Sequence, residues 1–346
     1  MNTLFLIGNG FDLAHGLKTK YSDFILWYLN QCLNKAFATN YIHDDTLLRL
    51  KILTFTTHDS YASLSELENN LRRGKLELTY KHPFIESIIS RFIDLKWVDI
   101  EAEYYAQIIK IYKHIEKVKY EYTINPAETI QPLNNCFSFI KDKLIEFLTI
   151  ESNQTCTINE EIHQNIKSAI ALRTNSSTRN LFLNFNYTST INLYTKEKSS
   201  FTINIHGSLN DTDNPIIFGY GDEMDTNYSK IEDLNSNPFL DYIKSFNYFK
   251  TNNYQQFSKF LEDGQFSVLI MGHSCGISDR ILLNSIFEHP NCEKIKIYYY
   301  QKDEAENDYF EKTQEISRHF HPKHKDIMRN KIVSFPESSP LIEYKG

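Results

Sequence analysis

Short hydrophobic runs that end at glycine, asparagine or histidine most strongly constrain what this chain can fold into. The first run, residues 3–7 (TLFLI), is followed at once by Gly8-Asn9-Gly10. Further runs cover residues 180–184, 201–206, 215–218, 266–271, 294–300 and 332–335. Runs this short and apolar, bounded by glycine, are typical of buried strands in parallel sheets. The pattern therefore predicts an α/β fold with a mostly parallel sheet flanked by helices.

The middle of the chain has a different character. Gly74 is the only glycine between residues 39 and 175, and helical patterns dominate there. We therefore predict one α/β domain from residues 1–38 and 176–346, with residues 39–175 forming a large helical insertion after the first strand. A length of 346 residues agrees with more than one folding unit. A further helix is expected from about residue 278 to residue 287.

Composition excludes several classes of protein. With 41% hydrophobic and 23% charged residues, the chain is neither disordered nor fibrous. Its net charge of −7 argues against a general nucleic-acid surface. The five cysteines form no CxxC pair and lack zinc-finger spacing, so free thiols in a reducing cytoplasm are expected, and no metal is predicted. No stretch approaches the roughly 18 apolar residues of a membrane span.

The first candidate site is the turn Gly8-Asn9-Gly10-Phe11-Asp12. Two glycines directly after a strand allow backbone amides to approach a phosphate. The match to G-x-G-x-x-G is incomplete, because Leu13 occupies the place of the third glycine. The turn therefore favours nucleotide binding and a simple tight turn about equally.

Three more clusters follow later strands. Asn184 ends one run and Asn186 follows it. His206 ends another, where it can act as a base near neutral pH or serve only in packing. Residues 272–276 (GHSCG) fit the G-x-S-x-G pattern of a hydrolase elbow, with Ser274 as nucleophile. That interpretation is disfavoured, because an α/β-hydrolase needs its acid and histidine in a particular order after the serine.

Together these segments resemble the AbiH family of bacterial abortive-infection proteins. The resemblance rests on residues 7–24 (IGNGFDLAHGLKTKYSDF), 97–101 (WVDIE), 184–188 (NFNYT), 205–207 (IHG) and 272–279 (GHSCGISD), which occur in the family's order. The opening segment is the most specific part, and Trp97 and Glu101 carry the match within the helical stretch. The resemblance implies a role in defence against phage.

The same order of motifs is more distantly similar to sirtuin-like domains, which have a Rossmann-type fold that binds NAD. This similarity implies that Asn186 positions water or ribose and that His206 is catalytic. Two further sets of residues are implied to bind or act on NAD: the first loop, Gly8, Asn9, Gly10, Phe11 and Asp12, and the adenosine-side loop, Gly272, Ser274 and Asp279. Asp12 or Glu101 would stabilise the developing charge. Asn9 and Thr188 depart from the usual sirtuin-like residues.

The resemblance implies an NAD glycohydrolase that cleaves the nicotinamide–ribose bond when phage infection triggers it. NAD would be the substrate. A phage-derived factor would be the partner, and the chain would assemble as a homo-oligomer. One alternative is a nucleotide-binding sensor that signals to a partner without catalysis and does not need His206. Another is a nuclease, which would need a carboxylate cluster for Mg²⁺, and the pairs considered for it are Asp222 with Glu223 and Asp99 with Glu101.

Overall fold

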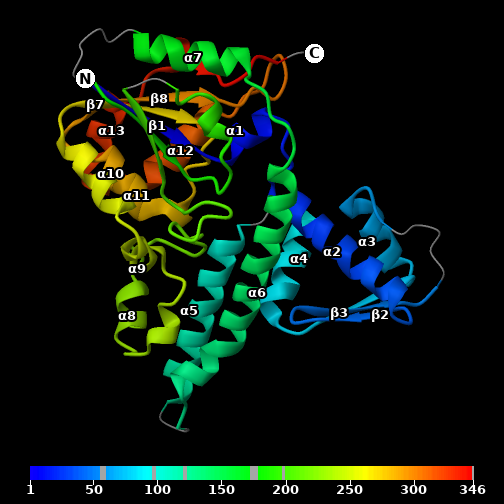
Figure 1. The fold of residues 1–346 in the computed structure, drawn as a ribbon. Coiled ribbons are helices and arrows are strands. Elements are labelled where there is room, and N and C mark those ends of the chain that lie inside the picture. The colour runs from blue at the N-terminus through cyan, green and yellow to red at the C-terminus, as the bar shows by residue number, and fades with distance from the viewer. Residues whose placement is uncertain (55–59, 96–98, 120–122, 172–177, 197–198, 345–346) are drawn as a thin grey trace. The chain divides into compact units, whose positions relative to one another are not determined.

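A six-stranded parallel sheet forms the core of the protein (Figure 1). The computed structural model describes residues 1–346 except 55–59, 96–98, 120–122, 172–177, 197–198 and 345–346. The sheet strands are β1 (Asn2–Ile7), β5 (Asn180–Asn184), β6 (Ser200–Asn204), β7 (Phe266–Met271), β8 (Cys292–Tyr299) and β9 (Ser339–Pro340). Their order is β6-β5-β1-β7-β8-β9. This is the order of a Rossmann sheet, in which the chain builds outward in both directions from the first strand.

Helices cover both faces of this sheet (Figure 1). They and the short helical turns of the same part of the chain are α1 (Asn9–Ala14), α7 (Glu160–Ala171), η1 (Thr190–Leu193), α9 (Lys244–Asn247), η3 (Tyr248–Lys250), α10 (Asn253–Glu262), η4 (Ile277–Asp279), α11 (Arg280–Phe287), α12 (Tyr309–Arg318), η5 (Pro322–His324), α13 (Lys325–Lys331) and η6 (Phe335–Glu337). One face packs Phe5 and Phe182 against Ile162 and Ile166 of α7. The other face packs against α10, α11 and α12.

The remaining elements include a second, smaller sheet. Its strands β2 (Ile42–Asp44), β3 (Leu48–Ile52) and β4 (Leu76–Tyr80) are antiparallel. The other helices are α2 (Tyr21–Ala38), α3 (Leu64–Arg72), α4 (Pro83–Leu95), α5 (Ile100–Val118), α6 (Pro126–Ser152), α8 (Tyr228–Glu232) and η2 (Asn237–Phe239). The segment after the first strand is thus largely helical, but it is not helical alone. No helix in the described part of the chain is long and apolar enough to cross a membrane.

The chain divides into two compact units. The first comprises residues 1–18, 148–224 and 243–346, and the second comprises residues 19–147 and 225–242. This division differs from the predicted segments, because helix α2 and residues 225–242 belong to the second unit whereas residues 148–175 belong to the first.

Two predicted strands are wrong. Residues 215–218 form no strand. Pro215 lacks an amide proton, and the Ile217 N–H donates to the His206 carbonyl without a ladder being formed. Residues 332–335 contribute one bridge, between Ile332 and Ile295, and the edge strand is β9 instead.

Candidate functional site

The polar residues singled out at or just after the ends of β1, β5, β6 and β7 gather at the carboxyl edge of the six-stranded sheet. Between β1 and β7 the direction of chain winding reverses, so this is the topological switch point. In open α/β sheets ligands bind outside the carboxyl ends of the strands at this point. The loops that begin at Gly8 and Gly272 follow these two strands, and both loops belong to the first compact unit.

The glycines of these two loops are pressed against each other. A Cβ on Gly8 would lie 2.4 Å from the Cα of His273, and one on Gly10 would lie 2.8 Å from the Cα of Gly272. Gly272 itself has φ +75°, and a Cβ there would lie 2.1 Å from the Phe11 nitrogen. Glycine is therefore required here because two backbones pack together at the switch point.

Hydrogen bonds within the protein occupy several amides of the first loop. Gly8 N–H donates to the carbonyl of Met271, Gly10 N–H to the carbonyl of Gly272, and Phe11 N–H to the carbonyl of Gly8. The Phe11 ring is fully buried in the core and packs on His15, with ring centroids 4.8 Å apart. The amides expected to approach a phosphate are thus engaged in this conformation.

Asparagine side chains join the ends of β5, β6 and β1. Asn184 Nδ2 donates to Asn204 Oδ1 at 2.9 Å and to the Thr188 carbonyl at 3.1 Å. Asn186 Nδ2 donates to the Gly8 carbonyl at 3.0 Å, so this half-buried residue does lie against the glycine turn.

Asp12 is the most unusual acid of this group. Its side chain is 1% exposed, and Oδ2 accepts a 2.6 Å hydrogen bond from Thr188 Oγ1. Oδ1 lacks a hydrogen-bond partner within ordinary distance among the described residues. Burial raises the pKa of Asp12 from 3.8 to about 6, although Thr188, Thr190 and Asn186 weakly oppose this rise. A buried carboxyl with a pKa near the cellular pH is typical of functional sites.

This perturbation gives a prediction for the stability of an Asp12→Asn variant. At about pH 8 the substitution should raise the free energy of unfolding by up to about 3 kcal/mol, because it removes the penalty of ionising a carboxyl with a pKa near 6. The penalty in wild type shrinks as the pH falls below about 6 and is fully lost only below the unfolded-state pKa of 3.8, where Asp12 is protonated in both folded and unfolded states. The gain should therefore shrink in acid.

Urea unfolding of both proteins at about pH 8, 6 and 4.5 measures this difference. The matched control is Asp142→Asn, an exposed substitution on α6 that should change stability by less than about 0.5 kcal/mol at every pH. A gain for Asp12→Asn that is equal at all three pH values would contradict the assigned pKa.

His206 belongs to a second buried group, around Asp279. The Asp279 carboxylate accepts a 2.7 Å hydrogen bond from the ammonium of Lys244, which is 1% exposed. His206 Nε2 lies 3.3 Å from Asp279 Oδ1 and 3.2 Å from the Tyr248 hydroxyl, and His273 Nε2 lies 3.6 Å from Asp279 Oδ2.

These charges set the protonation of the group. Burial and the nearby Lys244 lower the pKa of His206 to about 3, against the opposing effect of Asp279. Burial likewise lowers the pKa of His273 to about 4. Burial alone would raise the pKa of Asp279, but Lys244 and the two histidines hold it well below its usual value. At neutral pH the group therefore holds a neutral pair of imidazoles beside a buried ion pair.

The Phe185 ring lies against both histidines of this group. Its centroid is 5.2 Å from that of His206 and 4.1 Å from that of His273. Asn186, the next residue, instead contacts the Gly8 carbonyl. The structure thus brings the predicted residues to one edge of one sheet but arranges them in two hydrogen-bonded groups, one around Asp12 and one around Asp279.

The arrangement around Ser274 tests the hydrolase alternative. Ser274 is exposed, and its Oγ accepts a hydrogen bond from Gly276 N–H, whereas His273 Nδ1 accepts one from Cys275 N–H. The histidine beside the serine is thus not directed at it, which argues against a hydrolase elbow. Asn9 is exposed, and Trp97 lies outside the described residues.

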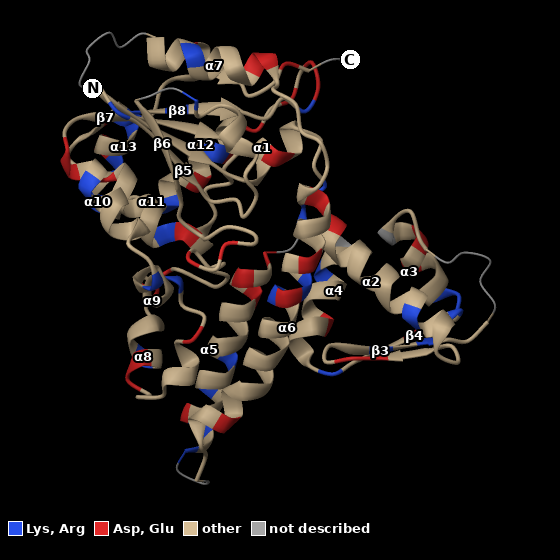
Figure 2. Cartoon of the chain, viewed as in Figure 1, with Lys and Arg blue, Asp and Glu red and all other residues tan. Residues whose placement is uncertain are grey.

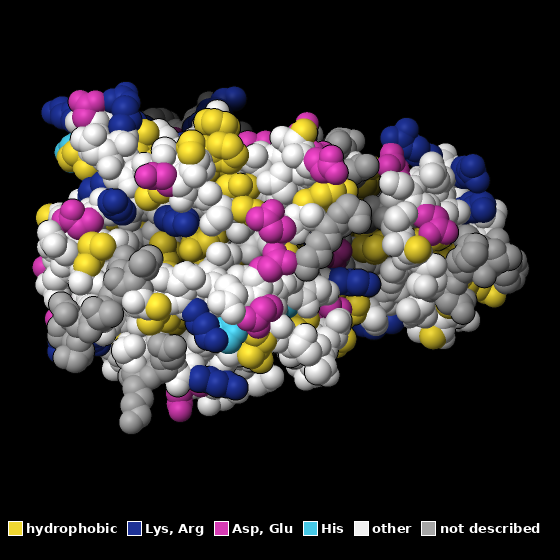
Figure 3. All heavy atoms as spheres, turned by 90° about the horizontal axis from the view of Figure 1, so that it is seen from above, with side chains coloured by type: hydrophobic (Ala, Val, Ile, Leu, Met, Phe, Trp, Pro, Cys, Tyr) yellow, Lys and Arg dark blue, Asp and Glu magenta, His cyan; other side chains and the backbone are white. Residues whose placement is uncertain are grey.

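The carboxylates considered for a nuclease already have other roles. Asp222 pairs with Arg280 at 3.2 Å, and Asp99 caps α5 by accepting from Ala102 N–H. Glu101 is buried on α5 in the second unit. Acidic and basic residues are interspersed along the chain and on the face seen in space-filling view (Figures 2 and 3).

Lys244 and Tyr248 are the residues of the site that sequence reasoning missed. They lie in a segment of short helical turns, α9 and η3, without glycine or a strand before them. Thr188 also belongs to the site, because its hydroxyl donates a hydrogen bond to the Asp12 carboxylate. A lysine in a chain with 37 basic residues gives no signal of burial, so only the fold reveals its place.

Fold and site together define a Rossmann-like α/β protein with two buried polar groups at its switch point. The model of the family "Bacteriophage abortive infection AbiH" matches residues 4–301, and the chain belongs to this family. A role in abortive infection of bacteriophage-infected cells follows from this membership. Among curated proteins none is similar enough to the chain to count as a match.

Proposed function

We propose that this protein binds NAD at the carboxyl edge of its six-stranded sheet and cleaves the nicotinamide–ribose bond during phage infection. The observation that carries the proposal is the position of Asp12, Asn186 and His206 at the switch point of a sheet with Rossmann strand order. Crevices at this point are where such sheets take dinucleotides.

The Asp12 group suits the charge that develops in this reaction. Cleavage of the nicotinamide–ribose bond builds positive charge on the sugar, as in glycoside hydrolysis. The nicotinamide leaves as a neutral molecule from a cationic ring, so little acid catalysis is needed. A carboxylate placed in a water-poor site stabilises such a cation far more than it would in water. Asp12, whose Oδ1 accepts no hydrogen bond from the described residues, supplies this group.

His206 and Asn186 would hold the substrate. Because the pKa of His206 is lowered to about 3, its imidazole is neutral at cellular pH and can accept a hydrogen bond from a ribose hydroxyl or water. The Asn186 amide lies at the glycine turn, where it can orient the ribose or the attacking water. Gly272, Ser274 and Asp279 would face the adenosine side.

Burial of the site agrees with an enzyme that is silent until triggered. Asp12 is 1% exposed and His206 is 4% exposed. A substrate therefore reaches them only when neighbouring side chains move, and continuous loss of NAD would harm the host cell. In this proposal a phage-derived factor in the cytoplasm, acting on a homo-oligomer of the chain, supplies that movement.

Nicotinamide release tests the proposal. The protein is purified from uninfected and from phage-infected cells, incubated with NAD, and compared with His206→Ala, Asn186→Ala and the exposed control His114→Ala. Wild type and His114→Ala from infected cells should release nicotinamide, and each site variant should be slower by at least about 100-fold. Asn186→Ala keeps the test valid if the buried His206→Ala fails to fold.

Other outcomes would contradict NAD cleavage. Equal inertness of wild type and variants under every trigger would refute catalysis. If calorimetry then shows tight NAD binding, and His206→Ala still protects cells, the protein is a nucleotide sensor that signals to a partner. Metal-dependent cleavage of RNA or DNA would instead identify a nuclease.

A further inference from the structure

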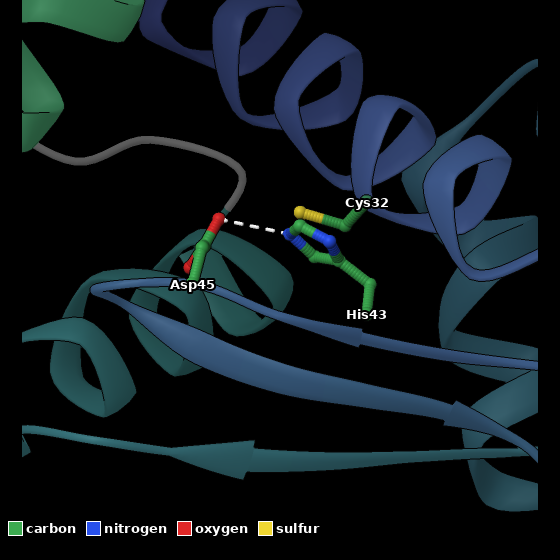
Figure 4. A group of neighbouring side chains, drawn as sticks. All are labelled: Cys32, His43 and Asp45. Carbon is green, nitrogen blue, oxygen red and sulfur yellow. Dashed lines mark hydrogen bonds and ion pairs between the residues drawn. The ribbon is translucent and has the colours of Figure 1, made fainter. Parts of the chain in front are cut away.

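Three side chains with metal-binding atoms converge in the second compact unit. Cys32 lies on α2, His43 on β2, and Asp45 directly after β2. Figure 4 shows the three side chains pointing toward one another. One ligand atom from each lies within 4.8 Å of those of the other two, and His43 Nε2 is 3.0 Å from Asp45 Oδ2. None of these residues takes part in the proposed NAD site.

The surroundings of Asp45 fix its carboxylate in place. Its Oδ1 accepts hydrogen bonds from the backbone amides of Leu47 at 2.9 Å and Leu48 at 3.2 Å. The Tyr28 hydroxyl donates to the same carboxylate at 2.9 Å. Hydrogen bonds that orient a ligating side chain are a regular feature of metal sites.

A small cavity opens beside the three ligand atoms. Its volume is about 10 Å³, and Cys32, His43, Asp45, Lys143 and Glu146 are among the residues that line it. This volume is close to the space that one water molecule needs. It therefore has room for about one ion or one water molecule.

The charge around the cavity suits a cation. Burial raises the pKa of the Cys32 thiol to about 12, so without a metal Asp45 and Glu146 balance Lys35 and Lys143. Loss of the thiol proton to a bound cation would leave one net negative charge around the cavity. Lys143 is moreover paired with Glu146 at 2.6 Å.

We propose that Cys32 Sγ, His43 Nε2 and Asp45 Oδ2 form a Zn²⁺ site, with the fourth position open to the cavity. Sulfur, imidazole nitrogen and carboxylate oxygen are the ligands zinc takes in proteins. Bonds of about 2.0–2.3 Å place tetrahedral ligand atoms about 3.3–3.8 Å apart. The His43 and Asp45 atoms, now 3.0 Å apart, would have to separate slightly, and a separation at the 4.8 Å limit would have to close by about 1 Å. A bound ion would join α2 to the small sheet.

A catalytic cysteine would be another role for a Cys-His-Asp cluster, but the surroundings of Cys32 do not suit it. Cys32 is 1% exposed, so a substrate has no access to its sulfur, whereas a zinc ion needs only the small cavity. A metal site therefore explains the arrangement better than a cysteine hydrolase does.

Metal titration of the full-length protein tests this site. After chelation and dialysis, Zn²⁺ binding is measured by calorimetry, and Co²⁺ binding by absorption, where a cysteine ligand gives a sulfur-to-cobalt charge-transfer band. Wild type should bind one ion per chain and show a higher Tm with Zn²⁺. Cys32→Ser and His43→Gln should bind at least about tenfold more weakly, and Cys32→Ser should lose the charge-transfer band.

The matched control is Cys136→Ser, which alters another buried thiol of the same unit. It should bind Zn²⁺ like wild type. Absence of stoichiometric binding to wild type would overturn the proposal, as would unchanged affinity in folded Cys32→Ser. If both ligand variants fail to fold, the Tm shift and cobalt spectrum of wild type alone decide, and the lack of either refutes the site.

Discussion

Replacing Asp279 by asparagine should lower the free energy of unfolding by about 3–5 kcal/mol, the largest polar effect expected in this chain. The carboxylate lies 2.7 Å from the Lys244 ammonium, and the lysine side chain is 1% exposed. Removing one charge of a buried pair leaves the other without its compensation in a medium that solvates it poorly. Urea unfolding near neutral pH measures the change.

An exposed ion pair provides the control for this substitution. Lys302 and Glu311 lie 3.5 Å apart, with 39% and 67% of their side chains exposed. Glu311→Gln should therefore change stability by less than about 1 kcal/mol, as exposed pairs usually do. If Asp279→Asn costs no more than Glu311→Gln, Lys244 and Asp279 do not form the buried pair described here.

Gly272→Ala should destabilise the protein by at least about 4 kcal/mol, because two effects combine there. The residue has φ +75°, and the added Cβ would lie 2.1 Å from the backbone nitrogen of Phe11. Since the opposing atom is backbone, no side chain can move aside to relieve the contact. The result should be loss of cooperative unfolding or a strongly reduced Tm.

Gly16→Ala separates backbone conformation from packing. Gly16 has a similar φ of +81°, but a Cβ there meets no atom within 4 Å. That variant should lose only about 1 kcal/mol, the ordinary cost of a left-handed alanine. Equal losses for the two variants would show that the loops after β1 and β7 are not packed as closely as described.

The parallel sheet was predictable because its central strands are buried on both faces. Residues 2–7 and 266–271 are buried throughout, and such strands appear in the sequence as largely apolar runs ended by glycine. The small antiparallel sheet was missed, although its signal exists. The five residues of β3 (LRLKI) alternate between buried and exposed, a pattern that favours a half-buried strand but is short enough to escape notice.

The edge of the sheet at which the candidate site lies was predictable, but the arrangement of the residues within it was not. Motifs at strand ends correctly indicated that residues 8–12, 186, 206 and 272–279 meet at the carboxyl edge, because parallel strands end together. Their grouping was not predictable. It depends on Phe185, which packs against two histidines, and on Lys244, which approaches from a segment without sequence signal.

The NAD content of phage-infected cells shows whether the protein cleaves NAD during infection. Cells expressing wild type, His206→Ala, Asn186→Ala or the His114→Ala control are infected, and NAD and nicotinamide are quantified over time alongside phage yield. If the protein cleaves NAD, then NAD falls, nicotinamide rises and phage yield drops with wild type and His114→Ala only. Protection with unchanged NAD, or NAD loss that persists in both site variants, would contradict it.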